Sequence, residues 1–238
     1  KREFVLQGLN DGLAFLDITV PQKVIYLGKL LSATDPSDWR DVKIYNDHAF
    51  IVSEASNHGL QVFDLNNLLE SDEFKTFSED YIANDFGNAH NIAINTSSGF
   101  AYVLGSALYK GGPVFYDISI PKKPIFSGGF SDTSYIHDAQ IITYKGEDQN
   151  YFEKEILFGS NSDGGETNQL IILDVTEKTN PELISTISYN YGGYTHQGWI
   201  DENHRYFYLG DELDELRYGN KTRIITFDLK DIKNPKIK

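Results

Sequence analysis

The sequence predicts an all-β fold, and two observations carry that prediction. A short apolar strand that closes on Asp followed by Ile, Leu or Val occurs five times in the 238 residues. Between these strands lie further runs of β-branched and aromatic residues separated by turn residues, and no segment keeps a helical period beyond about two turns. The five copies of the strand are residues 12–18, 59–65, 113–118, 170–175 and 223–229.

The repeated Asp residues define the length of the repeating unit. Asp17, Asp64, Asp117, Asp174 and Asp228 are separated by 47, 53, 57 and 54 residues. Each interval has room for four strands, which in the second unit we place at 41–45, 49–53, 59–65 and 74–77. Four-stranded units repeated every 40 to 50 residues or so are typical of a β-propeller. We therefore expect one propeller domain over residues 1–238, with five blades visible.

The two terminal units are shorter than the others. The first begins at its second strand, residues 3–7, and the last stops just after Pro235, before its outer strand. We therefore expect the propeller to be incomplete at both ends. Either the partial blades join into a closed five-bladed ring, or the chain is part of a six- or seven-bladed ring. We favour the larger ring, because an unclosed sheet edge invites pairing with other chains.

Composition limits the partners. The chain has 21 Lys and Arg against 35 Asp and Glu, a net charge of −14, and its basic residues form no run. We therefore expect no nucleic-acid partner and no anionic membrane surface. Its apolar runs fall short of the ~18 residues that span a bilayer, so we expect no transmembrane segment. The absence of cysteine excludes disulfides, thiolate nucleophiles and cysteine zinc sites.

A column of histidines is the strongest functional signal in the sequence. When the first strands of four units are aligned, His90, His137 and His196 share one position, and Arg40 holds it in the fourth. The first strand of a propeller blade lines the central channel. We therefore expect these four side chains to face one axis at one height.

Three interpretations of this column remain open. The histidines can form a packing network with the adjacent residues Asp41 and Asp138, or line a ligand-binding ring without metal. They can also bind a divalent metal, because three neutral imidazoles with an open position are a catalytic metal pattern. The number of blades decides between the last two. In a ring of more than five blades we expect a polar, water-filled channel rather than one metal on His90, His137 and His196.

Acidic residues are predicted to form a second ring at the channel mouth. Glu54 and the pair Asp211 and Glu212 follow the second strands of their units. We expect them near the histidines, with Arg40 neutralising Glu54 or clamping a carboxylate. The dense segment 211–215 has an alternative interpretation as an ordinary solvated loop. The remaining histidines, His48, His58 and His204, lie at turns and are expected to face solvent.

Several multi-residue blocks resemble one family. The chain resembles the choice-of-anchor B family, bacterial surface and secreted proteins with LVIVD-type propeller repeats. The resemblance implies export and attachment to the cell surface, in some members through type IX secretion, and it supplies no reaction. The blocks are residues 37–43, 53–55, 58–65, 90–95, 137–140, 196–199 and 211–215.

These features predict a secreted or cell-surface binding or scaffolding module. Its central channel and rims would bind a protein or glycan partner at the cell surface, and its location would be extracytoplasmic. The alternative is a metal-assisted hydrolase or lyase that uses the histidine ring in the channel. The sequence contains no complete catalytic motif, so it leaves open whether the chain is an enzyme.

Overall fold

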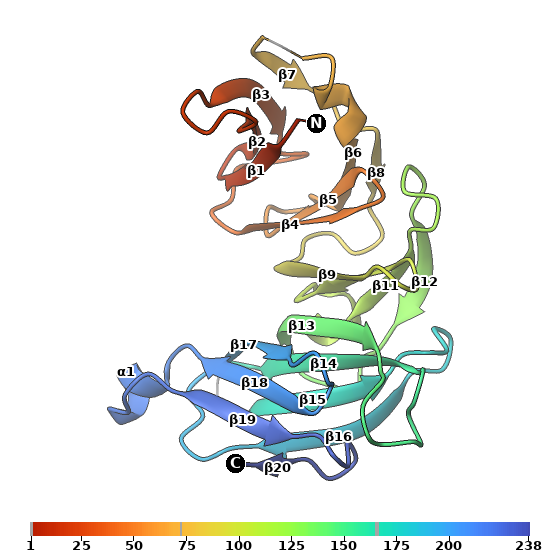
Figure 1. Ribbon diagram of the computed structural model, residues 1–238, viewed down its shortest axis with the longest axis vertical. Coiled ribbons are helices and arrows are strands. Elements are labelled where there is room, and N and C mark those ends of the chain that lie inside the picture. The colour runs from red at the N-terminus through yellow and green to blue at the C-terminus, as the bar shows by residue number, and fades with distance from the viewer. Residues whose placement is uncertain (1, 72, 165–166) are drawn as a thin grey trace.

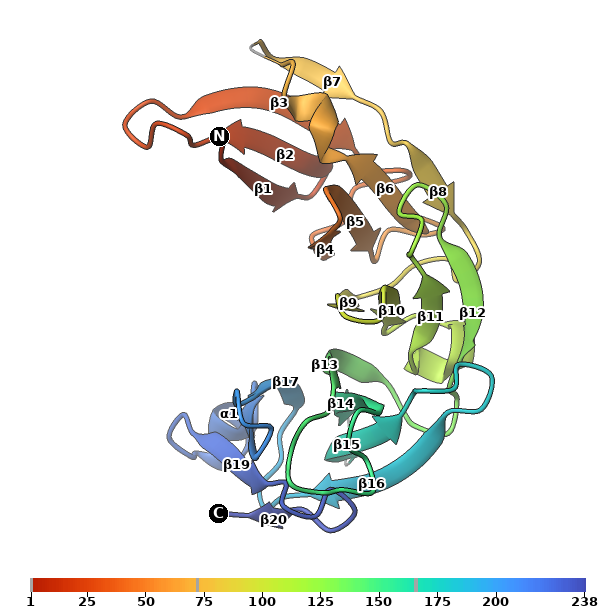
Figure 2. The ribbon, with the colours of Figure 1, turned by 45° about the vertical axis from the view of Figure 1, so that its right-hand side comes forward.

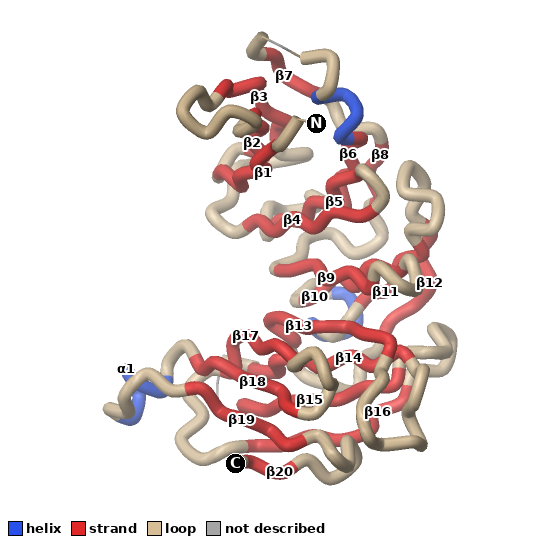
Figure 3. Tube along the Cα trace, in the orientation of Figure 1, coloured by secondary structure: helices blue, strands red, loops and turns tan. Residues whose placement is uncertain are grey.

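Five four-stranded sheets make up the molecule, which confirms the predicted all-β architecture (Figures 1 and 3). The computed structural model describes residues 2–71, 73–164 and 167–238. In these ranges, helical structure is limited to two 3₁₀ turns, η1 (Leu65–Leu68) and η2 (Leu108–Gly111), and one short helix, α1 (Asp214–Tyr218). No helix in these ranges is both long and apolar enough to span a membrane.

Four of the sheets follow chain order from their inner to their outer strand. The second sheet has β4 (Arg40–Tyr45), β5 (His48–Ser53), β6 (Leu60–Asp64) and β8 (Tyr81–Ala83). The third has β9 (Asn91–Asn95), β10 (Phe100–Leu104), β11 (Val114–Asp117) and β12 (Ile125–Gly129). The fourth has β13 (Ile136–Thr143), β14 (Glu155–Ser162), β15 (Asn168–Asp174) and β16 (Glu182–Ser188). The fifth has β17 (Thr195–Ile200), β18 (Tyr206–Asp211), β19 (Ile224–Asp228) and β20 (Lys236–Ile237).

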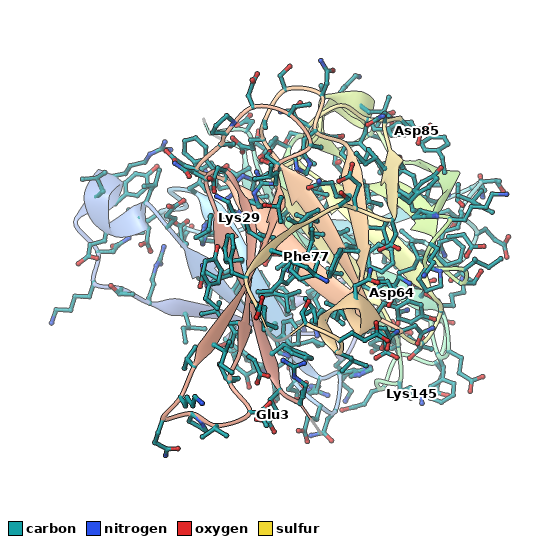
Figure 4. The ribbon with its side chains drawn as sticks, turned by 90° about the horizontal axis from the view of Figure 1, so that it is seen from above. Glu3, Lys29, Asp64, Phe77, Asp85 and Lys145 are labelled. Carbon is teal, nitrogen blue, oxygen red and sulfur yellow. The ribbon has the colours of Figure 1, made fainter. Side chains whose placement is uncertain are left out.

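The first sheet differs because its outer strand comes from the second unit. It contains β1 (Phe4–Leu9), β2 (Gly12–Asp17), β3 (Ile25–Leu31) and β7 (Lys75–Phe77), and β7 runs parallel to β3. The prediction that residues 74–77 form the edge of the second sheet is therefore wrong, and β8 takes that place. The physical reason is Phe77 (Figure 4), which is buried and packs edge-on against Phe15 and Phe63, with ring centroids 5.2 and 5.4 Å away.

The sheets succeed one another around an open arc, with the inner strands β4, β9, β13 and β17 on its concave side (Figure 2). The N- and C-terminal ends of the chain lie at the two ends of this arc. Apolar clusters fill the spaces between neighbouring sheets, so each internal sheet buries both of its faces. The concave side is therefore built from strands of consecutive sheets, which brings residues far apart in sequence to one level.

The outer faces of the two terminal sheets are exposed and apolar. On the fifth sheet, Trp199 is 67% exposed and Ile224 is 71% exposed, and Tyr208 lies beside Trp199 in the strand register. On the first sheet, Val5 and Tyr26 are exposed. We call these surfaces the terminal faces. Apolar patches of this kind are typical of surfaces that another protein element covers.

The repeated Asp residues have one local role. Each of them accepts a hydrogen bond from the backbone N–H two residues further on, so each closes its strand with an Asx turn. This geometry requires a short side-chain acceptor, which explains why the repeat ends on Asp. The donors are Thr19, Asn66, Ser119, Thr176 and Lys230, at 2.8, 2.9, 2.8, 3.1 and 3.0 Å.

We predict that acid destabilises the fold through these turns. Hydrogen bonds from Thr19 and then Arg2 lower the pKa of Asp17 to about 2. Bonds from the Lys230 backbone and then Lys238 lower the pKa of Asp228 to about 2 as well. An unfolded Asp has a pKa of about 3.9. The stability that each carboxylate contributes is therefore complete above about pH 5 and is lost as the pH falls toward 2.

Thermal unfolding followed by circular dichroism from pH 7 to pH 2 tests this prediction. Asp17→Asn should lower the Tm at pH 7, and its difference from the unmodified chain should shrink toward zero near pH 2. Asp35→Asn, at an exposed position, is the control and should follow the unmodified chain throughout. A difference for Asp17→Asn that stays constant with pH would contradict the prediction.

Candidate functional site

Two of the predicted histidines sit on β-bulges. The pairing between β13 and β14 skips His137, and the pairing between β17 and β18 skips His196. A bulged residue has no partner across the ladder, and bulges occur next to active sites, where they redirect a side chain. His90 reaches the same level differently, because it directly precedes β9.

The three histidine rings lie side by side. The ring centroids of His90 and His137 are 4.2 Å apart, and those of His137 and His196 are 4.4 Å apart. We call this group the histidine row. It joins three consecutive sheets, and His137 at its centre is the most deeply buried.

Hydrogen bonds fix the orientation of two of these rings. Nδ1 of His90 lies 2.6 Å from Oε1 of Glu54 and donates to it. Nδ1 of His137 donates to the backbone carbonyl of His196 at 2.9 Å. A neutral imidazole that donates from Nδ1 carries its lone pair on Nε2. His90 and His137 in their neutral form therefore offer Nε2 as a proton acceptor.

The environment keeps the central ring neutral. Burial, and then the neighbouring rings of His90 and His196, lower the pKa of His137 to about 4. At neutral pH the histidine row therefore has an uncharged ring at its centre.

Two tyrosines that the sequence prediction missed flank the histidine row. Tyr135 lies 6.3 Å from His90 between ring centroids, and Tyr194 meets His137 edge-on at 5.4 Å. Burial raises the pKa of both phenols, with a further contribution from Glu54 at Tyr135 and from Glu212 and then Glu54 at Tyr194. Both phenols therefore keep their protons and can donate hydrogen bonds. Each precedes a row histidine by two residues, so a Tyr-x-His repeat was the available signal.

The predicted carboxylates Glu54 and Glu212 both lie at this site. Glu54 follows β5 and binds His90, while Glu212 follows β18 and lies 3.6 Å from Nε2 of His196. One carboxylate thus flanks each outer ring of the row. Glu212 is half exposed, so this end of the row is open to solvent.

Arg40 points elsewhere, so the prediction that it neutralises Glu54 is wrong. Its guanidinium donates to the carbonyl of Leu9 at 3.2 Å, to Oγ of Ser32 at 2.8 Å and to Nε2 of His58 at 2.8 Å. These contacts join the first two sheets. His58 is completely buried rather than solvent-facing, and burial lowers its pKa, so it remains a neutral acceptor for Arg40.

Asp211 supports the loop that carries Tyr194. Asp211 therefore does not have the predicted position lining the channel. Its carboxylate accepts hydrogen bonds from the hydroxyl of Tyr189 at 2.6 Å and from the backbone N–H of Gly193 and Tyr194 at 2.8 and 2.9 Å. It also accepts from the backbone N–H of Leu213 and Asp214 at 3.0 and 2.8 Å. The segment that follows is thus held in place, unlike a freely solvated loop.

Asp41 and Asp138 follow Arg40 and His137 along the inner strands. Asp41 binds Lys43 at 2.6 Å and accepts from the backbone N–H of Ile92 at 3.2 Å, which ties the second sheet to the third. Burial raises the pKa of Asp138. Lys43 and Asp138 line a pocket of about 490 Å³ whose other wall includes Trp199.

The rings of the histidine row are not arranged around a common centre. In the described parts of the chain, no group of three or more His, Asp or Glu side chains is placed to hold a metal ion. The interpretation of His90, His137 and His196 as ligands of one metal therefore finds no support in this arrangement. What the arrangement does provide is a proton acceptor beside hydrogen-bond donors.

Comparison with known proteins supports the fold. No family model matches the chain, and no curated protein matches it. Among solved structures, a putative 6-phosphogluconolactonase from Bacteroides uniformis matches 99% of this chain and 66% of its own, with 11% identity and a TM-score of 0.65. A periplasmic gluconolactonase from Pseudomonas aeruginosa matches 97% of this chain and 64% of its own, with 9% identity and a TM-score of 0.60. A protein from Lactobacillus plantarum matches at 12% identity with a TM-score of 0.62.

These likenesses show a β-propeller fold, as the sequence predicts. At such low identity they show nothing about the reaction. The chain spans less than two thirds of the length of these three structures.

Proposed function

We propose that this chain is the catalytic part of a hydrolase that opens a lactone by general-base catalysis. The observation that carries the proposal is the 2.6 Å hydrogen bond from His90 to Glu54. A carboxylate bound to Nδ1 holds an imidazole in one tautomer and stabilises the cation that forms when Nε2 takes a proton. His90 is the general base, and Glu54 is its positioning residue.

The reaction can be written with these groups alone. Nε2 of His90 takes a proton from water, and the hydroxide oxygen bonds to the lactone carbonyl carbon. Tyr135 or Tyr194 donates a hydrogen bond to the resulting oxyanion. The tetrahedral intermediate then collapses, the ring C–O bond breaks, and the departing alkoxide takes the proton from His90. The product is the open hydroxy acid, and the site returns to its starting state.

The structural neighbours add fold-level support to this proposal. Two of them carry lactonase names, so a propeller of this shape is compatible with lactone chemistry. The likeness supplies no residue of the site, and the assignment of His90 and Glu54 rests on the geometry described above.

A rate measurement tests the proposal. The chain should open glucono-δ-lactone in a pH-stat faster than buffer does, and Glu54→Gln should lower kcat about 10²-fold or more, because the amide no longer stabilises the imidazolium. Glu202→Gln, an exposed position in the β17–β18 turn, makes the same change of charge away from the site and should leave kcat unchanged. A rate for the unmodified chain equal to that of buffer would refute the proposal.

A second candidate function is the binding module that the sequence predicts, on a secreted or cell-surface protein. The observation that favours it is the terminal face of the fifth sheet, where Trp199 and Ile224 are exposed. Large exposed aromatic residues are typical of binding hot spots. A pull-down from the cell envelope would recover a protein or glycan partner, and Trp199→Ser would release it. Failure to recover any partner, together with lactone turnover, would favour the hydrolase.

A further inference from the structure

Acidic groups surround the histidine row. Glu54 and Glu212 flank its two ends, at 2.6 Å from His90 and 3.6 Å from His196. On the inner strands beside it, Asp41 and Asp138 add two more carboxyl groups. The whole chain carries a net charge of −14, so its long-range electrostatic potential is negative, like the potential of the carboxylates beside the row.

The cations of the inner strands are already engaged. Arg40 and Lys43 are the only Lys or Arg residues on β4, β9, β13 and β17, all of whose residues are described. Each of the three nitrogens of the Arg40 guanidinium donates to one partner, Leu9, His58 or Ser32. Lys43 binds Asp41 at 2.6 Å. A phosphate group usually requires Arg, Lys or a cluster of backbone N–H donors, and the inner strands offer it no uncommitted Arg or Lys.

We infer that the site selects a lactone with an uncharged ring and rejects its phosphorylated counterpart. This inference rests on the proposed function and names its substrate class. Glu54 and Glu212 are the residues that set it, because a phosphate brought to the row meets both carboxylates at short range. The hydroxyl groups of an uncharged sugar ring, by contrast, donate hydrogen bonds, and such carboxylates accept them.

Matched substrates test the inference through turnover. At about 50 mM ionic strength, kcat/KM for glucono-δ-lactone should exceed that for its 6-phosphate by about tenfold or more. The ratio should shrink as salt is added, because salt screens the repulsion. Glu212→Lys should raise kcat/KM for the 6-phosphate by about tenfold. Glu202→Lys, which makes the same change of charge at the far end of the fifth sheet, should raise it much less.

Binding provides a readout that does not need turnover. The imidazole NMR signals of the histidine row should shift on addition of 1,5-anhydro-D-glucitol, an uncharged ring without a carbonyl group. They should shift much less with 1,5-anhydro-D-glucitol 6-phosphate at the same concentration. Binding of the uncharged ring without lactone turnover would refute the proposed hydrolase and support the inference on charge.

Two results would overturn the inference. One is equal or tighter binding, or equal or faster turnover, of the phosphorylated compound at low salt, which would leave the hydrolase proposal standing if the lactone is opened. The other is no binding and no turnover of either compound, which would refute both proposals.

Discussion

Replacing His90 with Ala is expected to lower kcat for lactone hydrolysis by about 10²- to 10⁴-fold, the range that a general base contributes. The variant removes Nε2, which takes the proton from water, and leaves Glu54 without the imidazole it orients. KM should change little, because the ring acts on water rather than on the bound lactone. The measurement is the pH-stat rate at saturating substrate.

Two controls separate loss of the base from loss of structure. His204→Ala removes a histidine from the β17–β18 turn and should keep kcat within about twofold of the unmodified chain. Added imidazole should partly restore the rate of His90→Ala, because it can fill the space and accept the proton. Full activity of His90→Ala would show that another group is the base.

Replacing Lys178 with Met is expected to destabilise the fold by about 3 to 5 kcal/mol, because it leaves a buried carboxylate without its counter-charge. Nζ of Lys178 binds Oε2 of Glu155 at 2.7 Å, and the two side chains are only 11% and 8% exposed. Asn95 and Ser98 also donate to Glu155, which joins the third sheet to the fourth. Urea unfolding followed by circular dichroism measures the change.

Lys233→Met is the matched control, because Lys233 lies on an exposed turn of the fifth sheet. It should change the free energy of unfolding by less than about 0.5 kcal/mol. A loss below about 1 kcal/mol for Lys178→Met would mean that Asn95 and Ser98 are sufficient partners for Glu155.

The sequence predicted the sheets well where the determining chemistry is local. Each repeat Asp forms its turn with a residue two positions away, so the repeat marks the end of a strand without knowledge of the fold. The edge strands were harder to place. β7 pairs with β3 across more than forty residues of chain, and it is held by contacts of Phe77 with Phe15 and Phe63 that appear only after folding.

The candidate site shows the same difference between features set by the local sequence and features set by contacts that form only on folding. The alignment of the inner strands predicted that His90, His137 and His196 lie at one level, because they occupy equivalent positions in successive inner strands. It did not predict the bulges at His137 and His196, which depend on how each strand pairs with its neighbour. It also misplaced Arg40, because a long side chain next to two sheets can turn to either, and the buried acceptor His58 decides the direction.

The open arc of sheets also has a mechanical consequence. Within the arc each internal sheet packs against its two neighbours, so a small rotation at one interface changes the curvature of the arc. The histidine row crosses two such interfaces, between the third and fourth sheets and between the fourth and fifth. The spacing of the rings in the histidine row is therefore coupled to the curvature of the arc. A molecule that bridges His90 and His196 would stiffen the third, fourth and fifth sheets against one another. Conversely, an element that packed against the terminal faces would restrict this curvature and, with it, the spacing of the rings.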